Sequence, residues 1–191
     1  MRQGARPHFQ NKRGDSALHV AAYSASAPIW KILLKAKPDV NITNEAGGTP
    51  LMVASHVGNL AAAKLLINAK AKIDVQSADG NTALLMAAQN EENEKRRNDV
   101  VLLLLQEKSD PNHRNRENHN ALYYAVLNED DKMVKTLLQH GARFNRDAEH
   151  DRKIWDTATE SENSRILSYL EAASKKGDGK KSSPSGAEKR G

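Results

Sequence analysis

The segment Gly48-Thr49-Pro50-Leu51-Met52-Val53-Ala54-Ser55 joins a turn glycine, a hydroxyl residue and a proline to a short apolar run. The same arrangement returns at 15–22, 81–88 and 119–126, and a degenerate fifth copy occupies 151–158. The key apolar residue of each copy is Leu18, Leu51, Leu84, Leu122 or Ile154, so the spacings are 33, 33, 38 and 32 residues. A period of this length is the sequence signature of a solenoid of stacked supersecondary units.

Each copy is followed by a second apolar block and then by a polar closing stretch. The second blocks lie at 29–34, 62–67, 100–105, 133–138 and 166–170. The hydroxyl of Thr49 can accept hydrogen bonds from exposed N–H groups at a helix start. Pro50 then takes the first helical position, where its missing N–H costs nothing, and Gly47 precedes them in a turn that favours positive φ. The pattern predicts a turn, a short helix, a turn, a second helix and an extended hairpin.

These features together resemble the ankyrin repeat, whose pattern runs G-x-T-P-L-H-x-A-A, then a helix with V-x-x-L-L, then G-A-D-V-N. Thr49-Pro50-Leu51 and Gly141-Ala142-Arg143-Phe144-Asn145 are the closest local matches. The resemblance covers residues 14 to 173 and implies an all-α ankyrin-repeat solenoid of about five helix-turn-helix/hairpin units, the last a degenerate cap. We expect the units at 14–43, 44–76, 77–114, 115–146 and 147–173.

The copies depart from the pattern in informative places. Asn118 replaces the turn glycine of unit four, and His150 replaces it in unit five, which we expect to close the array with a polar face. Only His19 keeps the motif histidine that ties repeats together in the family, so we expect packing to replace its hydrogen bonds elsewhere. Unit three carries extra charged residues within 90–98, which predict a solvated loop or one more turn of the first helix. A partner-specific element is the alternative. Trp30 and Trp155 are both expected in the core.

The net charge of +5 lies at the two ends of the chain. Residues 1–13 form a basic N-terminal arm of +4, and residues 174–191 form a basic tail of +4 that we expect to be disordered, which leaves −3 for 14–173. The tail is expected to aid solubility, with a nuclear signal or a patch for acidic surfaces as alternatives. A basic face for nucleic acid would need clustered cations on the folded part, and none is evident there.

The composition excludes several kinds of chemistry. Cysteine is absent, so disulfides, thiolate zinc sites and cysteine nucleophiles are excluded. No apolar run is long enough to span a bilayer, and the first residues lack the apolar core of a secretory signal. The chain has no G-x-S-x-G, P-loop or H-E-x-x-H motif, and its histidine pairs lack metal-helix spacing. We therefore predict no catalytic, cofactor-binding or metal-binding residues, and we expect a non-enzyme.

The resemblance also implies where a partner binds. In ankyrin-like arrays the hairpin tips and the exposed side of the first helices form one concave surface. Transferring these positions gives thirteen candidate partner-binding residues: Tyr23, Glu45, His56, Val57, Asp79, Asn81, Gln89, Asn90, Arg116, His119, Tyr124, Leu127 and Asn128. Interface cores favour aromatic residues and arginine, so Tyr23, His56, Arg116 and Leu127 are the strongest candidates. The alternative is an ordinary surface, because single exposed apolar side chains are common.

We expect a non-catalytic module that binds one folded protein partner through this concave face. Stoichiometric inhibition, sequestration and scaffolding all remain open, and the identity of the partner is unknown. The alternative function is association with nucleic acid or anionic surfaces through the basic ends. We expect a monomer without membrane insertion, in the cytoplasm or, as alternatives, in the nucleus, the periplasm or a secreted form whose leader has been removed.

Overall fold

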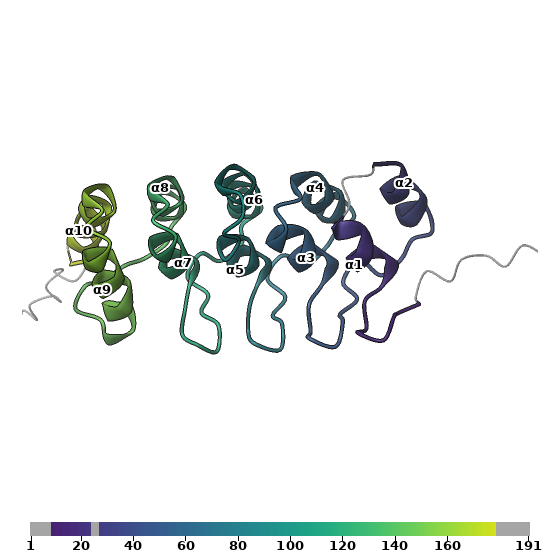
Figure 1. Ribbon diagram of the computed structural model, residues 1–191, viewed down its shortest axis with the longest axis horizontal. Coiled ribbons are helices and arrows are strands. Elements are labelled where there is room, and N and C mark those ends of the chain that lie inside the picture. The colour runs from purple at the N-terminus through teal and green to yellow at the C-terminus, as the bar shows by residue number, and fades with distance from the viewer. Residues whose placement is uncertain (1–8, 24–26, 179–191) are drawn as a thin grey trace, which may run out of the picture.

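The computed structural model describes residues 9–23 and 27–178. Ten α-helices and one short 3-10 helix form within these residues, and they contain no strand. The elements are α1 (Ala17–Ala22), α2 (Ala27–Lys35), α3 (Pro50–His56), α4 (Leu60–Asn68), α5 (Ala83–Ala88), α6 (Glu94–Gln106), α7 (Ala121–Leu127), α8 (Asp131–Gln139), η1 (Glu149–Asp151), α9 (Arg152–Glu160) and α10 (Ser164–Asp178). In Figure 1 the helix pairs lie side by side along one axis, with the odd-numbered inner helices nearer the hairpins than the even-numbered outer helices.

Polar side chains fix where the inner helices begin. The hydroxyl of Thr49 accepts a hydrogen bond from the backbone N–H of Met52 at 3.3 Å, and Thr82 accepts one from Leu85 at 3.4 Å. The Asn120 side chain does the same for Tyr123 at 2.9 Å. These bonds satisfy N–H groups that have no partner within the helix. The predicted cap at Thr49 is therefore confirmed.

The core consists of small and medium apolar residues repeated from unit to unit. The key leucines Leu51, Leu84 and Leu122 are fully buried, and so are the alanines on the same helices. Because alanine has no bulk beyond Cβ, adjacent inner helices can approach closely. Trp30 is buried as predicted. Trp155 is only half-buried, and the Arg146 guanidinium lies 4.3 Å from the centre of its ring.

The hairpin tips are joined to one another by backbone hydrogen bonds. These run from Glu45 N to Arg13 O (3.1 Å), from Ala78 N to Ala46 O (2.9 Å) and from Arg116 N to Asp79 O (3.0 Å). Gly14 has a φ of +76°, and a Cβ atom there would lie 2.7 Å from the Glu45 nitrogen. Glycine is needed both for the left-handed turn and for this close approach. Asn118 adopts the same kind of turn with a φ of 64°, as its position predicted.

Both predicted boundaries of the repeat array need correction. Gln10 forms a bridge with Ser16, so the first hairpin begins before residue 14. Helix α10 continues to Asp178, so residues 174–178, for which the sequence predicts a disordered tail, are helical. The remaining parts of the predicted arm and tail, 1–8 and 179–191, lie outside the described residues.

The extra residues of unit three lengthen its second helix. Helix α5 ends at Ala88 after six residues, whereas α6 has 13 residues and α4 has nine. The Asn93 side chain caps α6 by accepting a hydrogen bond from Arg96 N at 2.9 Å. The prediction that the insertion extends the first helix is wrong, because the charged residues after Asn93 continue in phase with the apolar block of α6.

Candidate partner-binding surface

One exposed row follows the C-terminal ends of the inner helices. It consists of Tyr23, His56, Gln89 and Leu127, which occupy equivalent positions in units one to four, and we call it the inner-helix row. The side chains of Tyr23 and Leu127 are 67% and 47% exposed. His56 is also exposed, whereas Gln89 is half-buried. The structure therefore keeps four predicted residues together as one row, with large side chains at its two ends.

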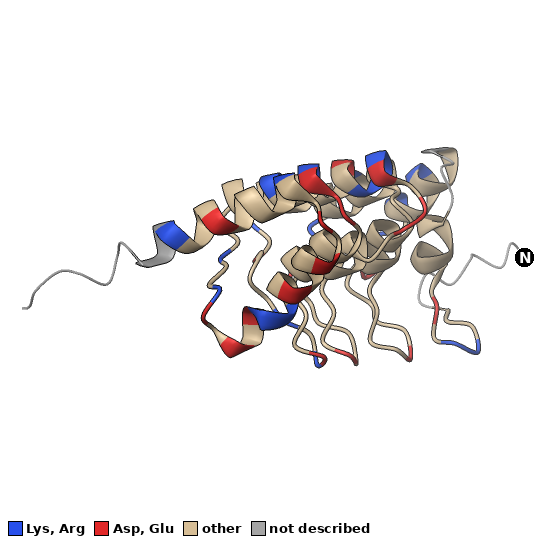
Figure 2. Ribbon diagram, turned by 60° about the vertical axis from the view of Figure 1, so that its left-hand side comes forward, with Lys and Arg blue, Asp and Glu red and all other residues tan. Residues whose placement is uncertain are grey.

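The hairpin tips supply a second, charged row. Glu45, Asp79 and Arg116 are exposed at the tips of units two, three and four, as predicted. The backbone bonds between tips hold these residues at the spacing of the repeats. Figure 2 shows basic residues at the first tip and acidic residues at the two tips that follow. The tips therefore present charges of both signs beside the inner-helix row.

A polar network connects the two rows between units three and four. The side-chain oxygen of Asn81 accepts hydrogen bonds from Gln89 Nε2 at 3.3 Å and from Asn115 Nδ2 at 3.0 Å. Asn115 Nδ2 also donates to the hydroxyl of Tyr124 at 3.2 Å. Three predicted residues, Asn81, Gln89 and Tyr124, are thus brought together. The network fixes their side chains before any partner arrives.

His119 lies in an aromatic corner formed with Tyr123, Tyr124 and Lys153. Its ring stacks on Tyr123 with 3.9 Å between ring centres, and it meets Tyr124 edge-on at 5.7 Å. Burial and the nearby Lys153 charge lower the pKa of His119, against an opposing effect of Glu117. Because the Lys153 ammonium can only donate, His119 Nε2 accepts a hydrogen bond from it at 3.0 Å. Lys153 also lies over the Tyr123 ring, an arrangement that favours a cation.

Comparison with known protein families agrees with this architecture. A family model described as ankyrin repeats (3 copies) matches residues 1–77, 18–115 and 70–148. The chain belongs to the ankyrin-repeat family. The predicted family and the all-α solenoid are confirmed, and ankyrin repeats generally mediate protein–protein interaction. No curated protein matches the chain.

Two of the predicted contact residues instead hold neighbouring ankyrin units together. Asn90 is buried, and its side chain donates to the backbone oxygen of His56. Asn128 Nδ2 donates to Ala88 O at 3.0 Å. The prediction of an exposed contact is therefore wrong for Asn90, because its amide is used between units two and three. Val57 and Asn128 are half-buried.

Asparagine side chains add hydrogen bonds between the units. His19 Nε2 lies 2.9 Å from Gly48 O, which ties unit one to unit two. Asn59 Nδ2 donates to Ala22 O at 3.0 Å, and Asn90 and Asn128 make the corresponding bonds at the next two junctions. The sequence predicts packing in place of the histidine bonds, and asparagine bonds accompany that packing at the later junctions. Asparagine stands one to three residues after α3, α5 and α7, and this recurrence is the signal that could have predicted these bonds.

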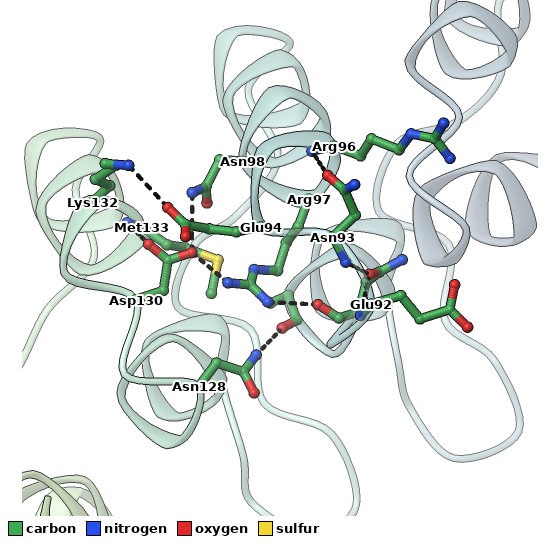
Figure 3. A network of polar contacts seen from close by, with 12 residues as sticks. Glu92, Asn93, Glu94, Arg96, Arg97, Asn98, Asn128, Asp130, Lys132 and Met133 are labelled. Carbon is green, nitrogen blue, oxygen red and sulfur yellow. Dashed lines mark hydrogen bonds and ion pairs between the residues drawn. The ribbon is translucent and has the colours of Figure 1, made fainter.

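A buried ion pair joins units three and four of the ankyrin array (Figure 3). Arg97 lies 2.6 Å from Asp130 Oδ2, and the two side chains are only 5% and 1% exposed. Arg97 also donates to Asn90 O at 2.7 Å, and Asn98 donates to Asp130 at 3.0 Å. The expectation that the charged insertion is wholly solvated is therefore wrong. Arg97 precedes Val100 and Val101 by three and four residues, which places it on the buried face of α6.

The described residues show few other chemical sites. Across 9–23 and 27–178, no group of three or more His, Asp or Glu side chains lies close enough together to hold a metal ion. None of the helices in these residues combines the length and the apolar character that crossing a membrane requires. The candidate site is thus the surface formed by the inner-helix row and the tips.

Proposed function

We propose that this ankyrin array binds one folded protein partner through the inner-helix row and the hairpin tips, and that it does so without catalysis. The observation that carries the proposal is the inner-helix row itself. The same position remains at least partly uncovered in four successive units, while the two positions before it are buried in each unit. Repeated exposure at one position of a solenoid supports a continuous contact surface rather than scattered surface residues.

The side chains suit the core and the rim of an interface. Tyr23 and Leu127 offer large exposed apolar surfaces, which are typical of residues that dominate binding energy. The charged tips surround them as a polar rim, where charge sets orientation and association rate. Because Asn81 and Gln89 are already hydrogen-bonded, binding requires little further ordering of side chains.

A surface of this kind favours a protein that acts by covering part of its partner. A chain that covers a partner's surface can inhibit it, sequester it or hold it beside another protein. The charge of −3 on residues 14–173 favours a basic partner. We place the complex in the cytoplasm. Association of the basic ends with nucleic acid is the competing function, and most of those ends lie outside the described residues.

The test compares matched pairs of surface substitutions in the full chain. Tyr23→Asp/Leu127→Asp alters the inner-helix row, whereas Ile32→Asp/Leu102→Asp alters exposed apolar residues of the outer helices. Immobilised proteins are exposed to nuclease-treated lysate of the source cells, and bound proteins are measured by mass spectrometry. We expect one protein in stoichiometric amount with the wild type and the outer-helix control. Capture should fall at least about tenfold with the inner-helix variant, because two central contacts are lost.

Circular dichroism first establishes that both variants are folded. Equal capture by the two double variants would contradict the proposal. Removal of residues 1–8 and 179–191 provides the third arm, and loss of binding only in that arm would assign the function to the basic ends. A parallel capture from lysate without nuclease treatment is the last arm, and binding seen only in that arm would point to nucleic acid.

A further inference from the structure

A pocket of about 1330 Å³ lies between units four and five, bounded by the outer helices α8 and α10. None of the thirteen predicted contact residues lines it. We call it the outer pocket and define it by Arg114, Lys135, Leu138, Arg143, Phe144 and Tyr169, which carry the argument below. It therefore belongs to a different surface from the inner-helix row.

The pocket exists because units four and five differ from the units before them. Gly141 occupies the position that is Lys37, Lys70 and Lys108 in units one to three, each with positive φ. A Cβ atom at Gly141 would meet no other atom within 4 Å. The fifth unit also replaces the hairpin turn with the short helix η1. The opening is thus left free where a lysine side chain stands in the other units.

The floor of the pocket is apolar and its rim is positively charged. Leu138, Phe144 and Tyr169 are the large apolar and aromatic residues of the lining, and Lys135 and Arg143 are exposed beside them. Among the described residues, Asp151 is the only carboxylate that lines the pocket. It is buried, pairs with Arg114, and accepts a hydrogen bond from Asn145 N at 2.8 Å. Within the described residues, the side chains of Lys135 and Arg143 have no carboxylate partner.

We propose that the outer pocket binds an acidic peptide segment of a protein partner. An apolar side chain of the peptide would pack on Leu138 and Phe144, and flanking carboxylates would pair with Lys135 and Arg143. The chain's own C-terminal residues 179–191 do not fit, because they carry four basic residues and one acidic residue. The volume exceeds that of ordinary small-molecule pockets, and the apolar floor distinguishes the pocket from a phosphate-binding groove. This inference does not rest on the proposed function.

The test measures binding of a fluorescent peptide of about ten residues that alternates glutamate with leucine and phenylalanine. Anisotropy titrations use the full chain, the variant Lys135→Glu/Arg143→Glu and the control Lys64→Glu/Lys72→Glu. The control positions are the equivalents of Lys135 and Arg143 in unit two, are also exposed, and change the net charge equally. We expect a dissociation constant below about 100 µM for the wild type and the control, and a loss of tenfold or more for the pocket variant.

A second variant tests the shape of the site without changing its charge. Gly141→Gln places a long neutral side chain at the opening, where three equivalent lysines tolerate positive φ. We expect it to weaken peptide binding severalfold while circular dichroism stays unchanged.

Three outcomes would overturn the proposal. The first is an equal loss of peptide affinity in the pocket variant and the unit-two control, which would indicate general charge attraction. The second is equal binding of a peptide whose apolar residues are replaced by serine. The third is stronger, pocket-dependent binding of a single-stranded oligonucleotide, which would assign the pocket to nucleic acid.

Discussion

The two ends of the array expose different kinds of surface. In unit one, Ile29 and Ile32 on α2 are 45% and 72% exposed. The residues equivalent to Ile29 in the next three units, Ala62, Val100 and Met133, are at most 1% exposed. In unit five the large apolar residues Ile154, Ile166 and Leu170 are buried. Unit one therefore exposes an outer-helix position that is buried in units two to four. In unit five, by contrast, the large apolar residues are covered by the unit's own helices and its neighbour.

This difference teaches that stability is unevenly distributed along the array. In a solenoid each unit is stabilised by its own packing and by its immediate neighbours. Units three to five add the buried Arg97–Asp130 pair and the long helix α10 to that packing. Unit one instead leaves Ile29 and Ile32 of its outer helix exposed. We therefore expect substitutions in the later units to lower the free energy of unfolding more than substitutions in unit one.

The largest effect is expected for Asp130→Ala. It removes the partner of the buried Arg97 and a cap of α8 together, because Asp130 also accepts a hydrogen bond from Met133 N. Leaving one charge of a buried pair uncompensated costs about 3–5 kcal/mol. The measurement is urea unfolding, and the control is Asp131→Ala, which removes only an exposed pair with Arg165 worth at most about 1 kcal/mol. Equal losses for the two variants would contradict the role of the buried pair.

The next largest effect on the free energy of unfolding is expected from comparing one substitution at each end of the array. Leu170→Ala in α10 removes a fully buried side chain, and we expect the free energy of unfolding to fall by about 2–5 kcal/mol. Ile32→Ala in α2 removes a side chain that is mostly in water already, so the change should stay within about 0.5 kcal/mol. Both are measured by urea unfolding under the same conditions. A similar loss for both variants would show that the first end is not open in solution.

The smallest effect is a pH dependence confined to units four and five. The pKa of His119 is lowered in the folded state, chiefly by burial and by Lys153. The unfolded chain therefore binds a proton near pH 6.5 that the folded chain resists. This contribution to stability is present above pH 6.5 and is lost as the pH falls below it. Hydrogen exchange should show α9 losing protection on acidification more than α3, and His119→Gln should remove that difference.

The sequence predicted those parts of the fold that depend on local chemistry. Thr49 and Asn118 act within a few residues of themselves, so a cap and a left-handed turn could be assigned from their neighbours alone. The Arg97–Asp130 pair was missed because its members are 33 residues apart and meet only when two units stack. Asn90 was misplaced for a related reason, since its acceptor belongs to another unit.

The candidate surface was predicted less completely than the fold. The exposure of Tyr23 and Leu127 followed from the position of each residue in the repeat. The outer pocket could not be predicted, because it depends on a lysine replaced by Gly141 and on a hairpin replaced by η1 in the following unit. Periodicity describes what the units share, and the pocket arises where they differ.

The hydrogen bonds between hairpin tips fix the spacing from one tip to the next. Each tip from unit one to unit four is bonded to the next through one backbone amide and one carbonyl. Moving a single tip to suit a partner would break a bond on at least one side, so the intervals between contact points are set by the repeats. For the binding proposed above, such a surface would require a partner whose own groups recur at matching intervals.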